Sequence, residues 1–155
     1  MSDRKIVTQN RKARHDYEIQ DIYEAGLVLV GSEVKSLRAG NANLKDSFVQ
    51  IDGGEAFLVG SFIAPYAFAR LGGHDPERRR KLLLHGREIE KLRVALVEKG
   101  LSLIPLSLYF TNGRAKVELG LGRGRRQYDK RHALKERDQK REMQRAVGKS
   151  SKNRM

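Results

Sequence analysis

The sequence contains no cysteine and no tryptophan, and only three of its 155 residues are proline. Without thiols it has no disulfide scaffold, thiolate nucleophile, iron–sulfur cluster or zinc finger. Long apolar runs are also missing, because stretches such as residues 27–30 are far shorter than the about 20 residues that span a bilayer. No signal peptide is visible near the start. We therefore expect a soluble, cytoplasmic protein.

Acidic residues are comparatively few. Nineteen Asp and Glu stand against 32 Lys and Arg, so the formal net charge is +13. This charge favours a polyanionic partner, nucleic acid first and an acidic membrane surface second. Residues 123–155 hold 13 Lys and Arg against 4 Asp and Glu, a balance of +9. Because this tail has too few apolar side chains to fold alone, we expect it to be disordered, or helical when bound.

The distribution of charge and glycine divides the chain into three parts. Three glycines within residues 120–124 follow the last strand-like run and mark the end of the folded part. We predict a flexible basic N-terminal arm over residues 1–14, an RNA-binding domain over residues 15–122 and a basic tail over residues 123–155.

The middle of the chain reads mostly as strands. Residues 48–59 predict a hairpin around Gly53-Gly54, and residues 106–119 predict another around Asn112-Gly113. Asn-Gly supplies the positive φ angles that a type I′ turn requires. Five or six strands with helices between them favour a mainly β fold, a small closed barrel, with an open sandwich as the alternative.

Helical patterns interrupt the strands. Apolar residues at helical spacing predict a helix over residues 87–99, with Gly100 at its end. Asp75-Pro76 is a suitable start for a second helix over residues 77–84. Residues 33–38 are compatible with a third, short one.

Catalytic and metal-binding patterns are missing. No pair of histidines has metal-ligand spacing, and residues 120–124 lack the lysine of a phosphate-binding loop. His74-Asp75 resembles a catalytic pair, but a loop residue before a helix cap explains His74 better. We expect no enzymatic activity and no cofactor.

A basic run directly precedes three leucines. It consists of Arg78, Arg79, Arg80 and Lys81. Such a run is often only a solvated face, but phosphates favour dense fixed cations through counterion release. We therefore interpret Arg80 and Lys81 as nucleic-acid contacts. The leucines beside them can pack against a sugar or an unstacked base.

Six short blocks occur in a recognisable order, at residues 10–17 (NRKARHDY), 23–26 (YEAG), 31–40 (GSEVKSLRAG), 43–48 (NLKDSF), 80–85 (RKLLLH) and 128–131 (YDKR). Together they resemble the SsrA-binding protein family, also called small protein B. The resemblance extends from about residue 8 to residue 147.

The resemblance implies an oligonucleotide-binding (OB) fold, a closed β-barrel with inserted short helices. It also implies an adaptor that binds the tRNA-like domain of transfer-messenger RNA and delivers it, with elongation factor Tu and GTP, to stalled ribosomes for trans-translation. There the barrel occupies the decoding region of the small subunit beside ribosomal RNA. The tail enters the empty mRNA channel as a helix.

The same resemblance assigns residues. Glu24 corresponds to a hydrogen-bond acceptor for RNA, Leu83 to an apolar contact and Lys116 to a phosphate partner. Arg14 and His15, in the first block, are further candidates for RNA contact.

In the tail, two triplets correspond to the ribosome-binding part of the family. Gly124-Arg125-Arg126 stands where the family usually has Gly-Lys-Lys, and Asp129-Lys130-Arg131 matches directly. Replacing lysine by arginine keeps the charge but changes the hydrogen-bond geometry.

Composition alone leaves other functions open. A general RNA-binding or ribosome-assembly protein with an OB-like barrel fits the composition equally well. Only the ordered blocks favour the SsrA-binding protein family over it. A small basic ribonuclease needs a general acid–base pair. Membrane binding fits least, because the potential tail helix has no apolar face.

Overall fold

The structure, a computed structural model, describes residues 4–66, 68 and 73–125. The chain up to Gly124 packs as one compact unit. Its elements, in chain order, are β1 Arg4–Gln9, α1 Ala13–Asp16, β2 Tyr17–Leu27, α2 Gly31–Arg38, β3 Ala42–Asn43, β4 Phe48–Asp52, β5 Glu55–Val59, β6 Phe62–Ile63, β7 Arg80–Leu83, α3 Gly86–Val97, β8 Ser102–Thr111 and β9 Arg114–Gly124.

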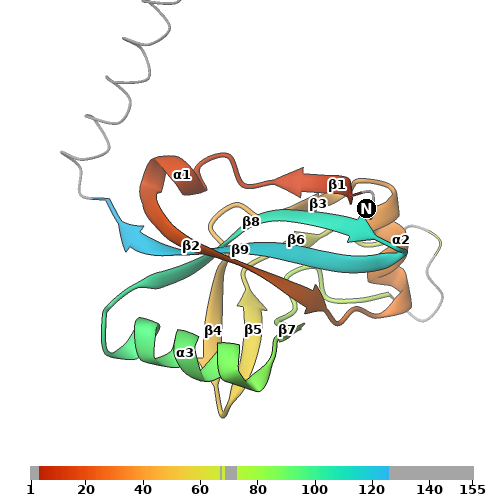
Figure 1. The fold of residues 1–155 in the computed structure, drawn as a ribbon. Coiled ribbons are helices and arrows are strands. Elements are labelled where there is room, and N and C mark those ends of the chain that lie inside the picture. Colours follow the sequence, from red (N-terminus) through yellow and green to blue (C-terminus); the bar gives the residue numbers. More distant parts are fainter. Residues whose placement is uncertain (1–3, 67, 69–72, 126–155) are drawn as a thin grey trace, which may run out of the picture. The chain divides into compact units, whose positions relative to one another are not determined.

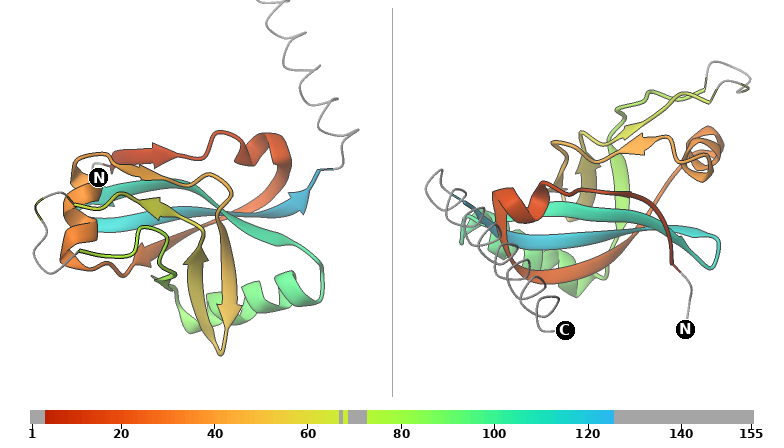
Figure 2. Two further views of the ribbon diagram at one scale, coloured as in Figure 1. Left: turned by 180° about the vertical axis from the view of Figure 1, so that it is seen from behind. Right: turned by 90° about the horizontal axis from the view of Figure 1, so that it is seen from above.

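The fold is mainly β, as predicted. A seven-stranded antiparallel sheet has the order β1-β8-β9-β2-β7-β5-β4, and β3 pairs with β6 separately. Figure 1 shows the long strands β2, β8 and β9 side by side, with β4 and β5 running across them. In both Figure 1 and Figure 2, α1 and α2 lie at opposite ends of these long strands.

The predicted closed barrel is wrong. In the described part of the chain the end strands β1 and β4 are not paired, so the sheet remains open. After β1 the chain enters α1, and no strand pairing joins β1 to β4. A side chain bridges this region instead, because the amide of Asn10 donates to the carbonyl oxygens of Pro105 at 3.0 Å and Leu44 at 3.5 Å.

The helix predicted over residues 77–84 is also wrong. The Asp75 side chain does accept the backbone N–H of Glu77 at 3.0 Å, as at a helix start. The residues that follow instead form β7, which pairs with β2 and β5. Arg80 and Leu82 are buried whereas Lys81 is exposed, an alternation with the period of a strand. Pairing on both sides of β7 outweighs the local helical signal.

The hairpins and the helix over residues 87–99 are confirmed. In the β8–β9 turn, Asn112 and Gly113 have φ angles of 51° and 75°, as a type I′ turn requires. Helix α3 spans Gly86–Val97 and buries Leu92 and Ala95. The short segment around residues 33–38 is helical as well, within α2.

The N-terminal residues differ from the expected loose arm. Residues 4–9 form β1, which pairs with β8 at the edge of the sheet. At the other end, the last strand continues to Gly124, two residues beyond the predicted boundary.

None of the helices in the described part of the chain has the length and apolar character of a membrane span.

The main core lies against one face of the sheet. Its members come from the sheet, α2 and α3, and include Ala25, Leu37, Leu82, Leu92 and Val117. A second, smaller cluster of Ala13, Ile104 and Leu106 packs with Tyr17 and Ile19 of β2. Away from that cluster, the face of β2, β7 and β9 opposite the main core is available for other contacts.

Candidate nucleic-acid interface

Three residues assigned by the resemblance lie on one face of the sheet. Lys116 of β9 is paired with Gly26 of β2, and Gly26 is paired in turn with Leu83 of β7. Glu24 lies two residues before Gly26 and so faces the same side, because successive side chains in a strand alternate. The intervening Ala25 is buried in the core. The structure therefore brings Glu24, Leu83 and Lys116 together across three neighbouring strands.

A groove of about 720 Å³ runs along this face, and all three residues line it. Leu83 is 56% exposed, so its side chain is available for an apolar contact. Gly26 makes room for it, because a Cβ atom at Gly26 would lie only 3.3 Å from the Cβ of Leu83. His85 and Arg114 add polar groups to the lining. The groove thus combines an exposed apolar contact with charged groups.

Two side chains from other strands hold Glu24. The hydroxyl of Tyr109 donates to Glu24 Oε2, and Arg4 Nη2 lies 3.3 Å from the same oxygen. The Arg4 guanidinium also lies 4.4 Å from the centre of the Tyr109 ring, and its Nη1 donates to Glu118 at 3.0 Å. Burial and the bond to Glu24 raise the pKa of Tyr109 well above its usual range, so its hydroxyl stays protonated.

Sequence reasoning missed Arg4 and Tyr109. Neither belongs to a motif, and 105 positions separate them in the chain. They approach Glu24 only through the pairing of β1 with β8, β8 with β9 and β9 with β2. The one available signal was a tyrosine within the apolar run of β8, since a buried tyrosine hydroxyl usually has a hydrogen-bond partner.

Arg80 does not belong to this surface. Its side chain is fully buried, and its Nε donates to Glu33 Oε2 at 2.5 Å. Its Nη1 donates to the carbonyl and hydroxyl oxygens of Ser61, both at 3.0 Å, and its Nη2 to the carbonyl of Pro76 at 3.0 Å. With every nitrogen engaged inside the protein, Arg80 has no group left for a phosphate. The prediction that Arg80 contacts RNA is incompatible with this structure.

The partner of Arg80 is itself buried. Glu33 also accepts hydrogen bonds from Arg78 Nη2 at 2.5 Å and from the backbone N–H of Val30 at 2.9 Å. Burial raises the pKa of Glu33, but the hydrogen bonds from Arg78, Val30 and Arg80 together outweigh it and hold the pKa below its ordinary value. The pair therefore joins α2 to β7 and the segment before it.

The rest of the basic run is on the surface. Lys81 faces the same side as Leu83, and its Nζ lies 3.4 Å from Glu55 Oε1. Arg79 stacks 3.9 Å from the centre of the Phe57 ring. Both cations remain accessible beside the groove, so the structure divides the run into surface and buried members.

Known proteins are similar to this chain over most of its length. The family model described as SmpB protein matches residues 7–149. This chain belongs to the SmpB family. The curated relatives called SsrA-binding protein include that of Parafrankia sp., 58% identical over 152 residues, which cover 98% of this chain and 96% of the relative. That of Bacillus subtilis is 54% identical over 148 residues, covering 96% and 95%.

A solved structure supports the same assignment. The chain in "tmRNA-SmpB: a journey to the center of the bacterial ribosome" is 48% identical to this one, with a TM-score of 0.66. The similarity covers 82% of this chain and 93% of that chain. The mainly β architecture is thus shared with an SmpB chain.

Two residues of the first ordered block, at positions 10–17, lie away from the groove. Arg14 and His15 belong to α1, at the end of β2 opposite to Glu24. Arg14 is exposed, and His15 Nδ1 lies 2.9 Å from Asp16 Oδ1. From Tyr17 to Glu24, β2 extends about 23 Å. The structure therefore does not bring Arg14 and His15 together with Glu24.

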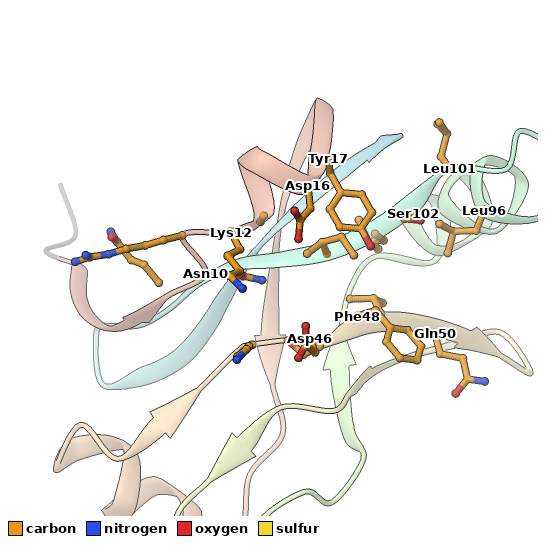
Figure 3. A pocket seen from close by; sticks show the side chains of 18 of the residues that line it. Asn10, Lys12, Asp16, Tyr17, Asp46, Phe48, Gln50, Leu96, Leu101 and Ser102 are labelled. Carbon is orange, nitrogen blue, oxygen red and sulfur yellow. The ribbon is translucent and has the colours of Figure 1, made fainter. Parts of the chain in front are cut away.

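Beside α1 lies a second depression, of about 810 Å³, where the sheet remains open. Figure 3 shows Lys12, Asp16 and Tyr17 on one side of it and Phe48 with Gln50 on the other. Its lining mixes both signs of charge with aromatic side chains, so it has no clear preference for an anion or a cation.

The SmpB tail is described only at its start. Gly124 is the last residue of β9 and is paired with Tyr17, and Arg125 follows it. Arg126, Asp129, Lys130 and Arg131 lie outside the described residues.

The ring of His74 has a structural role. His74 Nε2 lies 2.9 Å from the carbonyl oxygen of Ile63 and therefore donates to it. Its Nδ1 lies 2.8 Å from the hydroxyl of Ser32. Both ring nitrogens thus serve to attach the loop before β7 to α2 and β6.

Proposed function

We propose that this chain is an RNA-binding adaptor that recognises the tRNA-like domain of transfer-messenger RNA and delivers it to stalled ribosomes for trans-translation. The observation that carries the proposal is the grouping of Glu24, Leu83 and Lys116 on one face of the sheet. Family membership and the net charge of +13 support it. In this proposal the chain positions RNA and catalyses no reaction.

Each of the three side chains suits one part of an RNA. The ammonium group of Lys116 attracts a phosphate. Leu83 offers an apolar surface to a sugar or to a base that is not stacked in a helix. Glu24 repels phosphates, so it favours an RNA that presents a base or ribose donor at this point over RNA that presents only backbone. Shape and this carboxylate, rather than charge alone, therefore supply the selectivity.

Lys81 and Arg79 extend the proposed surface beyond the groove. Both are surface cations with partly satisfied charges, and such pairs exchange readily for phosphate contacts. Arg14 and His15 form a separate patch, which we assign to a second RNA segment rather than to the groove.

The tail carries the proposed ribosome contact. We expect Gly124, Arg125, Arg126 and the triplet Asp129-Lys130-Arg131 to engage ribosomal RNA in the decoding region and mRNA channel, through a segment that orders on binding. Elongation factor Tu with GTP joins through the RNA complex in this proposal.

Three substitutions test the groove. Glu24→Ala, Leu83→Asp and Lys116→Ala should each weaken binding to the tRNA-like domain. Leu83→Asp should cause the largest loss of affinity, because it puts an anion beside phosphate. Val97→Asp and Lys99→Ala, on exposed positions at the end of α3, are the matched controls. Affinity is measured at one stated salt concentration alongside the thermal melt. Wild-type affinity in all three folded groove variants would refute the site.

A second RNA distinguishes the adaptor from a general RNA-binding protein. An unrelated structured RNA should compete poorly with the tRNA-like domain, and equal competition would favour general binding. For the tail, a chain truncated after Arg125 keeps β9 intact. It should retain RNA binding but lose tagging of stalled peptides in a translation assay, and normal tagging would contradict the assigned role.

A further inference from the structure

The carboxylate of Glu24 is held by one of its two oxygens. Oε2 accepts the hydroxyl of Tyr109 and lies 3.3 Å from Arg4 Nη2. Among the residues that the structure describes, Oε1 has no hydrogen-bond partner. The Glu24 side chain is 44% exposed, so this second oxygen remains open to a ligand.

Tyr109 is well suited to hold a neighbour in place. It is 1% exposed, so its ring cannot change rotamer without disturbing the sheet. The hydroxyl that reaches Glu24 is the polar end of an otherwise buried side chain. A hydrogen bond from such a fixed donor to a carboxylate is stronger than one between neutral groups.

Arg4 counters a repulsion that the strand register creates. Glu24 and Glu118 are directly paired across β2 and β9, and like charges in that position destabilise a sheet. Arg4 lies between them, with Nη1 on Glu118 at 3.0 Å and Nη2 on Glu24. Its stacking on Tyr109 fixes the guanidinium plane. Without Arg4 the two carboxylates would turn away from each other.

We infer that Tyr109 and Arg4 are positioning residues that fix Glu24 with Oε1 facing the RNA, where it accepts an N–H or O–H of an unpaired base or a ribose. The inference rests on the proposed function of the groove. A free glutamate has several rotamers, and selecting one on binding costs affinity. A carboxylate fixed beforehand avoids that cost and accepts only a donor that arrives along one direction.

The inference predicts that Tyr109 acts through Glu24. Tyr109→Phe keeps the buried ring and removes only the hydroxyl, and Tyr23→Phe, in β2 with its side chain packed toward the core, is the matched control. Affinity for the isolated tRNA-like domain of transfer-messenger RNA is measured at fixed salt for Tyr109→Phe, Glu24→Ala and the double variant. Thermal melts of the free proteins confirm that each is folded.

We expect Tyr109→Phe to weaken binding roughly three- to tenfold, and to have no further effect in the Glu24→Ala background. Arg4→Gln should behave in the same way with a smaller loss, because the Arg4–Glu24 pair is exposed. Tyr23→Phe should bind like the wild type.

Other outcomes overturn the inference in distinguishable ways. If Glu24→Ala weakens binding but both Tyr109→Phe and Arg4→Gln bind normally, the positioning role is wrong and the proposed function stands. If Tyr109→Phe costs the same with and without Glu24, Tyr109 contacts RNA or supports the fold independently. If Glu24→Ala itself binds normally, the assigned groove contact fails, and the positioning role fails with it.

Discussion

Replacing Arg80 with methionine should destabilise the protein rather than remove an RNA contact. Methionine retains a long apolar side chain but provides no donors. The substitution leaves the buried carboxylate of Glu33 without one of its partners and removes the Arg80 donor from the oxygens of Ser61, whereas the Pro76 carbonyl keeps the backbone N–H of Ile63. Buried polar groups without partners are the costly consequence of such a change.

The magnitude follows from the burial of the pair. Removing one member of a buried ion pair typically costs about 3–5 kcal/mol. Glu33 retains the hydrogen bonds from Arg78 and Val30, so we expect the lower end, about 3 kcal/mol. For a compact unit of this size each kcal/mol lowers the Tm by about 4 °C, so the Tm should fall by about 12 °C.

Urea unfolding and a thermal melt measure this loss, and Arg79→Met is the matched control. Arg79 is the preceding arginine, but it lies on the surface and stacks on Phe57. It should change stability by less than about 1 kcal/mol. RNA affinity of Arg80→Met, measured well below its Tm, should stay near wild type. The reasoning is refuted if Arg80→Met is as stable as Arg79→Met, or if it loses RNA affinity while its stability is unchanged.

Three further predictions follow from the fold. Because the pKa of Glu33 is lowered in the folded state, its ionised carboxylate stabilises the fold above the ordinary pKa of 4.5, and this stabilisation is lost as the pH falls through the folded-state pKa. Glu33→Gln should therefore flatten the acid side of a curve of unfolding free energy against pH. An unchanged curve would contradict the assignment. Gly122→Ala should cost about 2–4 kcal/mol in urea unfolding, because its Cβ would lie 2.2 Å from the carbonyl oxygen of Glu18, whereas Gly86→Ala, with no atom within 4 Å, should be tolerated. Gly113→Ala should lower the free energy of unfolding by about 1 kcal/mol, since Gly113 has a φ of 75°, which alanine adopts only with strain. Equal urea midpoints for the variant and the wild type would exclude strain at that turn.

Local patterns in the sequence identified those parts of the protein that depend on neighbouring residues. The β8–β9 hairpin followed from Asn112-Gly113, because the turn needs positive φ at adjacent positions whatever surrounds it. Helix α3 followed from apolar residues at helical spacing that end near Gly100. Glu24, Leu83 and Lys116 were named from the family resemblance, Glu24 and Leu83 within its ordered blocks and Lys116 in the last strand, without knowledge that they lie side by side.

Tertiary structure decided the features that depend on distant partners. The sequence of the basic run at residues 78–81 predicts one cationic surface patch. Arg80 is nevertheless buried, because Glu33, 47 positions away, neutralises its charge inside the protein. The same region is a strand rather than a helix because β2 and β5 pair with it on both sides. Likewise, the residues that hold Glu24 come together only through strand pairing. Free energies of burial, charge pairing and sheet registry depend on which segments meet in space, and no local window of sequence contains that information.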